Sequence, residues 1–357
     1  MSDSGEQARL PEGGRKVALI TGITGQDGTC LAQLLLKKGY QVAGTSRNPV
    51  PGKWRLEEVG LSGHAHLKLQ QLNLGNADQC EGLVAELQPT EVYNLGGLSF
   101  IGKSFEDPLR TAETTGLGAI NLLEAIRIAC PSARFFQAST SEIFGNAADT
   151  PQDEETPFRP RSPYVVAKLF AHWGAVSYRE SFGIFAASGI LYNHESPLRG
   201  IEFVTRKISV AVARIKYGLQ EVVELGNLAA SRDWGYAPEY ADAMWRTLQA
   251  DSPGTFVLAS GRLTSVREFV EAAFHAIGVD LVWQGQGTDE TGRDRSTGAI
   301  RVRVSPEFFR PVETGQLCGN PAKAHIMLRW KAATEVDEIC RIMVHKDLER
   351  TGPGGLA

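Results

Sequence analysis

The chain has 357 residues, of which 42% are hydrophobic and 22% are charged, and its formal net charge is −4. This composition supports a large buried core, arranged as one large α/β domain or as two lobes. The charge balance and the absence of a long basic run argue against a nucleic-acid partner, and no apolar stretch is long enough to span a membrane. Residues 1–15 are polar and lack the hydrophobic region of a signal peptide, so we expect a disordered leader.

The cysteines are odd in number, widely spaced and form no Cys-x-x-Cys motif. They are Cys30, Cys80, Cys130, Cys318 and Cys340. This usage predicts reduced thiols in a cytoplasmic protein, without a metal centre.

A glycine-rich turn follows the first predicted strand, residues 16–21. It reads Gly-Ile-Thr-Gly-Gln-Asp-Gly at positions 22–28 and precedes a segment whose apolar residues recur with helical spacing. Glycines three apart between a strand and a helix let the backbone approach a pyrophosphate, whose charge the helix N-terminus stabilises. The turn therefore predicts dinucleotide binding.

Arg47 ends the second predicted strand, residues 40–47, and no acidic residue stands near it. In a dinucleotide-binding fold this strand ends at the adenosine ribose. An acid there binds the 2′-hydroxyl of NAD, whereas a cation suits the 2′-phosphate of NADP. We therefore predict NADP as the cofactor; the alternative for Arg47 is an ordinary solvated charge.

Strands and helices alternate through the rest of the first half of the chain. We expect further strands at 66–72, 90–95, 134–138 and 184–190, and helices at 53–60, 77–87, 109–129 and 164–182. This alternation predicts an α/β fold, a Rossmann-type doubly wound parallel sheet. Such sheets bind ligands at the carboxyl ends of their strands, where Gly22, Gly96 and Thr140 stand.

Four side chains near the end of the fifth strand suit proton and hydride chemistry at a sugar carbon. Thr140 and Glu142 follow that strand, and period-two alternation is expected to point both side chains the same way. Tyr164 and Lys168 have the i, i+4 spacing that stacks them on one helical face, just after a proline that suits a helix start. An ammonium beside a phenol favours the phenolate, so we expect the pKa of Tyr164 to lie below its ordinary value.

The sequence changes character after residue 191, where regular patterns become sparse. Candidate polar residues in this part are Asn193, His194, Arg199, Thr205, Arg206, Lys207, Arg232 and Arg310. Although scattered charges are usually solvated, we expect a smaller lobe that holds a second phosphorylated ligand through guanidinium contacts, with closing helices at 266–277 and 334–349. The expected parts are the leader at 1–15, an NADP-binding domain at 16–191, a substrate lobe at 192–351 with segments returning to the first core, and a tail at 352–357.

Longer motifs extend the pattern from residue 17 to residue 349. They are ALITGITGQDG at 18–28, QASTSE at 137–142, PRSPY at 160–164, NHESP at 193–197, FVTRKI at 203–208, LGNL at 225–228, RDWG at 232–235 and RPVE at 310–313. On these motifs the chain resembles the GDP-mannose 4,6-dehydratases, which are extended short-chain dehydrogenase/reductases. The resemblance implies a homodimer or homotetramer that acts on a GDP-hexose with bound NADP.

The resemblance also implies roles for individual residues. The implied catalytic residues are Thr140, Glu142, Tyr164 and Lys168. The implied cofactor-binding residues are Gly22, Ile23, Thr24, Gly25, Gln26, Asp27, Gly28, Arg47, Asn73, Leu74, Leu95, Gly96, Gly97, Ser99, Tyr164, Lys168, His194 and Arg199. The implied substrate-binding residues are Ser99, Thr140, Asn193, Val204, Lys207, Arg232, Arg310 and Glu313.

Several positions depart from the family pattern. Asn48 stands where the family carries a second arginine in the ribose-phosphate loop, and Arg110 stands in place of a tyrosine on the cofactor side. Asn73 replaces an aspartate at the adenine, and Leu98 and Phe100 replace polar groups near the sugar. We therefore predict the reaction type and leave the identity of the hexose open.

The predicted mechanism is an internal redox reaction without net consumption of cofactor. Tyr164 accepts the O4 proton as C4 is oxidised, Glu142 removes the C5 proton and assists loss of the C6 hydroxyl, and Thr140 hydrogen-bonds O4. Two alternatives stay open. A GDP-sugar reductase or epimerase of the same superfamily needs no Glu142, and a non-catalytic NADP-binding protein needs none of the four side chains.

Overall fold

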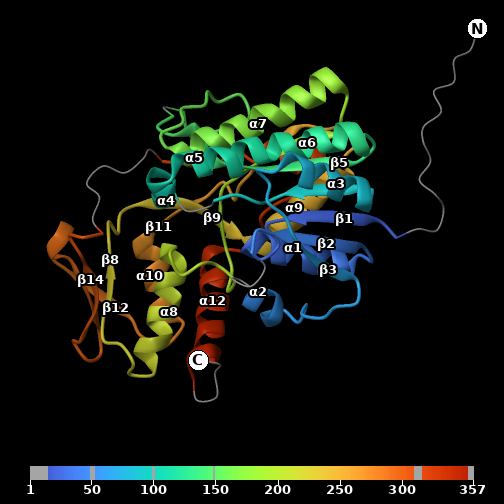
Figure 1. The fold of residues 1–357 in the computed structure, drawn as a ribbon. Coiled ribbons are helices and arrows are strands. Elements are labelled where there is room, and N and C mark those ends of the chain that lie inside the picture. The colour runs from blue at the N-terminus through green and yellow to red at the C-terminus, as the bar shows by residue number, and fades with distance from the viewer. Residues whose placement is uncertain (1–14, 49–52, 99–100, 148, 309–315, 353–357) are drawn as a thin grey trace, which may run out of the picture.

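Seven parallel strands form the central sheet of the computed structural model, which describes residues 15–48, 53–98, 101–147, 149–308 and 316–352. Their order across the sheet is β10-β6-β5-β4-β1-β2-β3 (Figure 1). The strands are β1 (Val17–Thr21), β2 (Gln41–Ser46), β3 (Leu67–Gln71), β4 (Glu91–Asn94), β5 (Arg134–Thr140), β6 (Ala186–Leu191) and β10 (Thr255–Leu258). The predicted α/β class with a doubly wound parallel sheet is confirmed.

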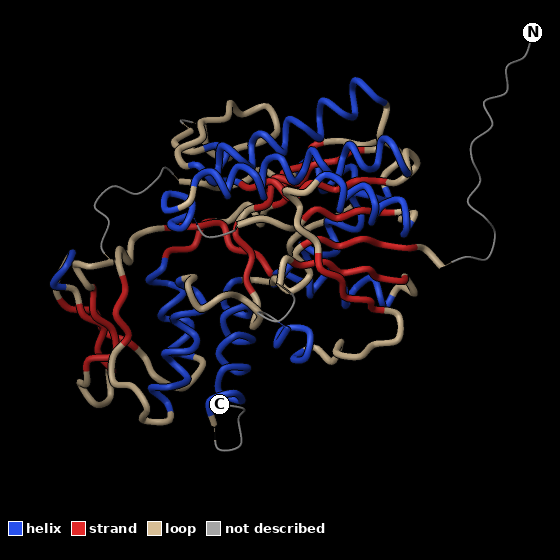
Figure 2. The backbone as a smooth tube through the Cα atoms, viewed as in Figure 1, coloured by secondary structure: helices blue, strands red, loops and turns tan. Residues whose placement is uncertain are grey.

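Helices cover both faces of this sheet (Figure 2). On one face lie α3 (Ala77–Leu87), α4 (Ile101–Glu106), α5 (Pro108–Thr111), a π-helical turn (Ala112–Leu117), α6 (Gly118–Ala129) and α7 (Pro163–Phe182). On the other lie α1 (Gln26–Lys37) and α9 (Ala237–Gln249), with α2 (Lys53–Glu58) beside α1 and α11 (Ala322–Leu328) beside α9. Because both faces are covered, β6 is buried along its whole length and consists of small and apolar residues.

The order of the strands creates a crevice at one edge of the sheet. The chain runs from β1 outward through β2 and β3, and then crosses back to β4 on the other side of β1. At such a reversal the connections leave the carboxyl ends in opposite directions, so a space opens where doubly wound sheets bind their ligands. The glycine turn at 22–28 lies at this point.

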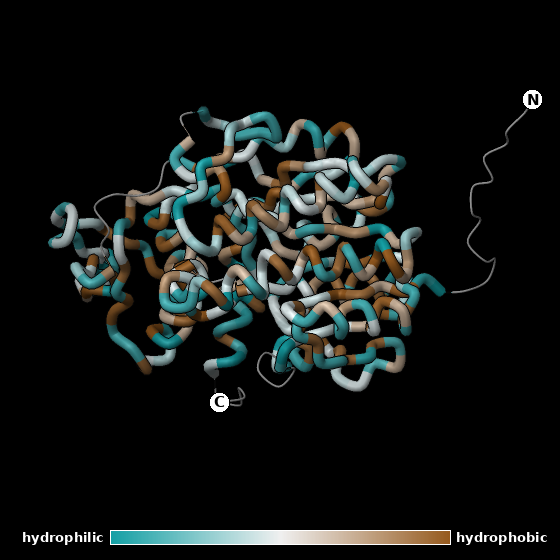
Figure 3. The backbone as a smooth tube through the Cα atoms, turned by 45° about the horizontal axis from the view of Figure 1, so that its top comes forward, coloured by the Kyte–Doolittle hydropathy of each residue, from teal (hydrophilic) through white to brown (hydrophobic). Residues whose placement is uncertain are grey.

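A smaller lobe has its own core, at the lower left of Figure 1. Apolar side chains of α8 (Val204–Lys216), α10 (Val266–His275) and α12 (Val336–Thr351) pack together there, among them Ile208, Phe269 and Met343. One small sheet contains β7 (Asn193–Glu195), β9 (Ser231–Tyr236) and β11 (Leu263–Ser265), and the other contains β8 (Val223–Leu225), β12 (Leu281–Gln284), β13 (Thr291–Asp294) and β14 (Ile300–Val304). In Figure 3 hydrophobic stretches run through the interior of both lobes, whereas hydrophilic ones lie mainly along the outside.

The small sheets, α8, α9 and α11 were not expected from the sequence. Strands of three or four residues carry little periodicity, and the parallel pair β8–β14 joins Val223 to Val302, far apart in the chain. The predicted helices at 266–277 and 334–349 are confirmed as α10 and α12. β10 and α9, both beyond residue 191, belong to the central sheet and its cover, while the domain boundary itself stays a prediction.

The helix expected at 109–129 is confirmed: α5, the π-helical turn and α6 follow one another without a break, and the backbone widens by one residue at Ala112–Leu117. One local expectation was wrong. Strand β5 ends at Thr140, and Glu142 lies in a 3-10 turn, Ser141–Phe144, so period-two alternation does not relate the two side chains. The Thr140 hydroxyl instead accepts a hydrogen bond from the Glu142 N–H at 3.3 Å.

Candidate active site

A cleft of about 700 Å³ opens at the carboxyl ends of β1, β2 and β4. The glycine turn lines it, together with Arg47 after β2 and Arg110 in α5. Thr114, from the π-helical turn, lines the same side as Arg110. The cleft therefore joins the crevice of the sheet to helices of the covering layer.

The glycine turn leaves no room for side chains. A Cβ on Gly22 would lie 2.9 Å from the Leu95 carbonyl oxygen, and one on Gly28 would lie 2.5 Å from the Gly22 carbonyl oxygen. Gly22 also has a φ of +69°, in the left-handed region that favours glycine. Helix α1 starts directly after Gly25 without a side-chain cap, so its first N–H groups are left for a ligand. This close backbone and open helix N-terminus fit the pyrophosphate of a dinucleotide.

Asp27 of the turn and the buried His194 form a partly buried ion pair. Nε2 of His194 lies 2.9 Å from an Asp27 carboxylate oxygen, and Nδ1 lies 2.6 Å from the Tyr192 carbonyl oxygen. Since both partners are acceptors, both ring nitrogens carry protons and the imidazole is a cation. Burial alone would lower the pKa of His194, yet the Asp27 carboxylate raises it above its ordinary value. Burial opposes the charge of Asp27 as well, but His194 holds the pKa of Asp27 well below its usual range.

Most of the predicted cofactor residues line the cleft. They are Gly22, Thr24, Gly25, Gln26, Asp27, Gly28, Arg47, Leu74, Leu95, Gly96, Gly97 and Arg199. The side chain of Ile23 is buried, and the carboxamide oxygen of Asn73 accepts the Gly75 N–H at 3.2 Å. His194 stands behind Asp27, and Ser99 lies outside the described residues. The binding roles stay predictions.

The predicted catalytic residues gather where β5 ends and α7 begins. Ser162 caps α7 and a proline occupies its first turn, which sets Tyr164 and Lys168 one turn apart on the buried face. The Lys168 ammonium donates to the Ala138 carbonyl at 2.8 Å and lies 6.0 Å from the centroid of the Tyr164 ring. Burial lowers the pKa of Lys168 to about 8. Glu142 and Thr140 both influence Tyr164 electrostatically, so all four side chains share one small region.

The expected low pKa of Tyr164 was wrong for the protein as it stands. Burial raises the pKa of this phenol well above its ordinary value, and the Glu142 carboxylate raises it further. The Thr140 hydroxyl and the charge of Arg199 act in the opposite direction without reversing the shift. The sequence shows the spacing of Tyr164 and Lys168 but not the depth of their burial, and burial outweighs the ammonium here.

Four of the predicted substrate residues come from elements of the smaller lobe. Asn193 is on β7, Val204 and Lys207 are on α8, and Arg232 is on β9. None of these four lines the 700 Å³ cleft. The Lys207 ammonium lies 3.8 Å from the centroid of the Phe308 ring, and Arg232 donates to the Ser231 carbonyl at 2.8 Å. Arg310 and Glu313 lie outside the described residues, so the structure does not test whether this set comes together.

Three further predicted positions are now placed. Arg206 is buried in α8, where it forms an ion pair with Asp347 of α12. Thr205 is buried and donates to the Glu195 carboxylate at 2.5 Å. Leu98 is half-buried and its N–H donates to the Thr115 hydroxyl at 3.2 Å, whereas Phe100 lies outside the described residues.

Some lining residues were missed by sequence reasoning. The clearest is Arg55 of α2, which donates to the Thr24 carbonyl at 3.2 Å and to the Leu198 carbonyl at 2.6 Å, next to the glycine turn. The other lining residues without a predicted site role are Thr21, Thr45, Ser46, Asn48, Leu72, Arg110, Thr114, Gly200, Glu202 and Phe203. A cation in the short helix after the second strand is the only sequence signal for Arg55, and it does not distinguish a site from a solvated surface.

Comparison with known proteins identifies the family. The family model described as GDP-mannose 4,6 dehydratase matches residues 19–343. The chain belongs to the GDP-mannose 4,6-dehydratase family. It is 49% identical over 343 residues to GDP-mannose 4,6 dehydratase 2 of Caenorhabditis elegans, covering 94% of this chain and 89% of that protein. It is 48% identical to GDP-mannose 4,6-dehydratase of Sinorhizobium fredii, covering 94% and 97%.

Solved structures of lower identity share the fold of this GDP-mannose 4,6-dehydratase family member. The structure of RMD from Pseudomonas aeruginosa complexed with NADPH superimposes with a TM-score of 0.73 at 22% identity, covering 94% of this chain and all (100%) of that one. At this identity the similarity concerns the fold alone.

Three general features of this dehydratase family member concern its cysteines, its helices and its possible metal ligands. All five cysteines are buried and none forms a disulfide. Among the residues that the structure describes, no helix combines the length and apolar character needed to cross a bilayer. Within the same residues, no group of three or more histidine, cysteine, aspartate or glutamate side chains is placed to hold a metal ion.

Proposed function

We propose that this chain converts GDP-mannose, or another GDP-hexose, into the corresponding GDP-4-keto-6-deoxy sugar with bound NADP. The observation that carries the proposal is the shared location of Thr140, Glu142, Tyr164 and Lys168 beside a dinucleotide-shaped cleft, in a member of this family. Glu142 favours elimination over simple reduction or epimerisation, because those reactions require no carboxylate base in addition to the tyrosine.

The lining of the cleft supports cofactor contacts by the chain's own groups. The N–H groups at the start of α1 and the glycine backbone would hold the pyrophosphate, and Arg47 would hold the ribose 2′-phosphate. When bound, NADP supplies the acceptor and donor for a hydride that leaves C4 and returns to C6. Arg47, with no acid among its neighbours in sequence, supports NADP over NAD.

Tyr164 is the base for the O4 hydroxyl in this proposal. Burial keeps it as a phenol until positive charge favours the phenolate. Arg199 acts in this direction, and Lys168, with a pKa of about 8, is mostly an ammonium at neutral pH. The Thr140 hydroxyl hydrogen-bonds O4 as C4 becomes a ketone.

Glu142 then moves the second proton. The C4 ketone acidifies the C5–H, Glu142 removes that proton, and the resulting acid protonates the C6 hydroxyl as it leaves. Hydride addition at C6 and transfer of the proton held on Tyr164 to C5 complete the 4-keto-6-deoxy product and return both residues to their starting states. The balance is loss of one water with no net oxidation.

The test is to incubate the purified chain with GDP-mannose without added reductant. We expect a 4-keto product and one equivalent of water lost, and Tyr164→Phe as the matched control should form neither. A GDP-sugar reductase, an epimerase or a non-catalytic binding protein forms no 4-keto-6-deoxy product under these conditions, so its absence contradicts the proposal.

We also propose that the chain forms a homodimer or homotetramer. Apolar side chains are exposed on adjoining helices: Phe105 on α4, Leu109 on α5, Leu117 on the π-helical turn, and Val166, Phe170 and Trp173 on α7. An apolar patch of this kind on a soluble domain usually serves an interface. Light scattering should give a dimer or tetramer mass, and Trp173→Glu should lower it; a monomeric wild type contradicts the proposal.

The buried, unpaired cysteines support a cytoplasmic location.

A further inference from the structure

Two arginines from separate parts of the chain line the same cleft, close enough for the charge of Arg110 to act on Arg47. Arg47 follows β2, and Arg110 is in α5 of the helical layer. Both line the cleft, as do Leu72, Leu74 and Thr114. Because Arg47 and Arg110 are far apart in the chain, the sequence alone does not predict that they line one cleft. They do so because α5 and the π-helical turn lie over the carboxyl ends of the strands.

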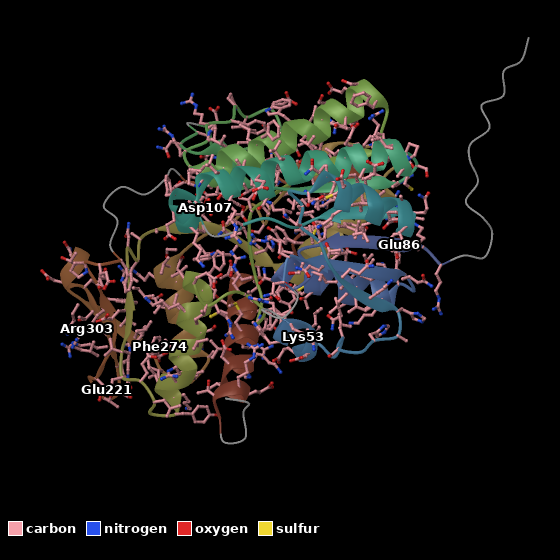
Figure 4. The ribbon with its side chains drawn as sticks, in the orientation of Figure 1. Lys53, Glu86, Asp107, Glu221, Phe274 and Arg303 are labelled. Carbon is pink, nitrogen blue, oxygen red and sulfur yellow. The ribbon has the colours of Figure 1, made fainter. Side chains whose placement is uncertain are left out.

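The position of Arg110 is set by its backbone. The Asp107 carboxylate caps α5 by accepting the Arg110 N–H at 3.1 Å, and the Thr111 hydroxyl donates to the Asp107 carbonyl at 2.8 Å. Figure 4 labels Asp107 at this corner. The π-helical turn follows at once and leaves Arg110 and Thr114 facing the same cleft. A π-helical turn is often found at a functional site.

The two cations have no protein counterion among the described residues. Neither forms an ion pair there, and the two carboxylates that line the cleft are engaged elsewhere, Asp27 with His194 and Glu202 near Arg55. The Glu113 carboxylate lies instead beside Gly75: a Cβ added to that glycine would stand 2.7 Å from Oε1 of Glu113. Burial lowers the pKa of Arg47, and the charge of Arg110 lowers it further. Two like charges facing one space are stabilised by an anion between them.

We propose that Arg110 is a specificity-determining residue that binds, together with Arg47, the 2′-phosphate of the adenosine ribose of NADP. This inference rests on the proposed function and names the residue that completes its cofactor preference. In a doubly wound sheet the second strand ends at that ribose, and the planar donors of a guanidinium match a phosphate. The apolar Leu72 and Leu74, which line the same cleft, suit the adenine ring, which both NAD and NADP contain.

The test measures binding without turnover. The full chain is titrated calorimetrically with 2′-phospho-ADP-ribose and with ADP-ribose, which differ only in the phosphate and carry no nicotinamide. We expect the wild type to prefer the first. Arg110→Ala should weaken that ligand by about tenfold to a hundredfold, the range of a charged hydrogen bond, and leave ADP-ribose unchanged. Arg110→Lys keeps the charge without the planar donors and should fall between the two.

Two further variants make the result specific. Arg127→Ala removes another exposed arginine, paired with Glu124 on α6, and should change neither affinity. Arg47→Ala should reduce the same preference, and the double variant should abolish it. Because Arg110 is exposed, its variants should keep the wild-type melting temperature.

Each contrary outcome has a different meaning. Equal weakening of both ligands by Arg110→Ala would place Arg110 against the shared adenosine and overturn the inference. An unchanged preference in Arg110→Ala, with a lost preference in Arg47→Ala, would overturn the role of Arg110 and leave the proposed cofactor standing. A wild type that binds both ligands equally would overturn the NADP proposal itself, and this inference with it.

Discussion

Tyr164 and Lys168 have only 8% and 7% of their surface exposed, whereas Arg47, which lines the open cleft, is half-buried and Arg110 beside the same cleft is exposed. At the buried end, loss of solvation moves both pKa values, so protonation depends on which neighbouring charges are present. At the open end the guanidinium groups stay charged at any relevant pH. The buried residues can therefore transfer protons, and the two arginines can only select what binds.

Tyr164→Phe should have the largest effect at the buried end. Without its base the O4 proton cannot leave, so oxidation of C4 should fail and turnover should drop by about 10²–10⁴-fold. Stopped-flow mixing with NADP and GDP-mannose should show no reduced-nicotinamide absorbance. Affinity for 2′-phospho-ADP-ribose serves as the control and should be unchanged; a normal rise in absorbance would remove Tyr164 from its role.

Glu142→Gln should separate the two halves of the mechanism. The amide keeps the size of the side chain but can neither remove the C5 proton nor protonate the C6 hydroxyl, so elimination should become rate-limiting, with turnover lower by about 10²–10⁴-fold. The variant should accumulate reduced nicotinamide and 4-ketosugar, with little deuterium incorporated at C5. Near-normal turnover together with C5 exchange would reopen the reductase and epimerase alternatives.

Lys168→Met should reveal the free-energy cost of burying the Lys168 ammonium. The folded-state pKa of about 8 lies below the unfolded value of 10.5, so between these values the unfolded chain binds more protons and wild-type stability rises with pH. In the wild type the free energy of unfolding should rise by up to about 3 kcal/mol between these pH values, and in the variant this rise should be absent. Turnover of the variant should also fall. Urea unfolding at pH 7.5 and pH 10 measures the rise, with the exposed Lys37→Met as control. Identical pH profiles for wild type and Lys168→Met would contradict the burial argument.

His194→Gln should have the smallest effect. The pKa of His194 is raised, so its contribution to stability is complete below its unfolded value of 6.5 and is lost as pH rises through the folded value. Asp27 contributes above 3.8 because its pKa is lowered. The variant should lose about 1–3 kcal/mol near pH 5.5 and less at pH 9, by denaturant unfolding. The exposed pair His275 and Asp280 offers the control His275→Gln, which should change little. A loss independent of pH would indicate packing against Tyr240 rather than charge.

Local patterns predicted the elements of the first half of the chain well. The helix expected at 77–87 is α3 with those bounds, since Asn76 caps it and Cys80 and Val84 recur on its buried face. The helix start before Tyr164 was confirmed for the same reason, a Ser162 cap followed by a proline. Glu142 shows the limit: its neighbourhood with Thr140 was expected from a strand pattern, but a 3-10 turn produces it.

The sequence by itself determined the parallel sheet, the glycine turn and the helix that carries Tyr164 and Lys168, because each depends on the order and spacing of residues close together in the chain. Only the tertiary structure decided the high pKa of Tyr164, the ion pair of Asp27 with His194, and the meeting of Arg47 with Arg110. These depend on depth of burial and on which segments become neighbours across the sheet. Burial and electrostatic interaction act through space, so no pattern along the chain records them.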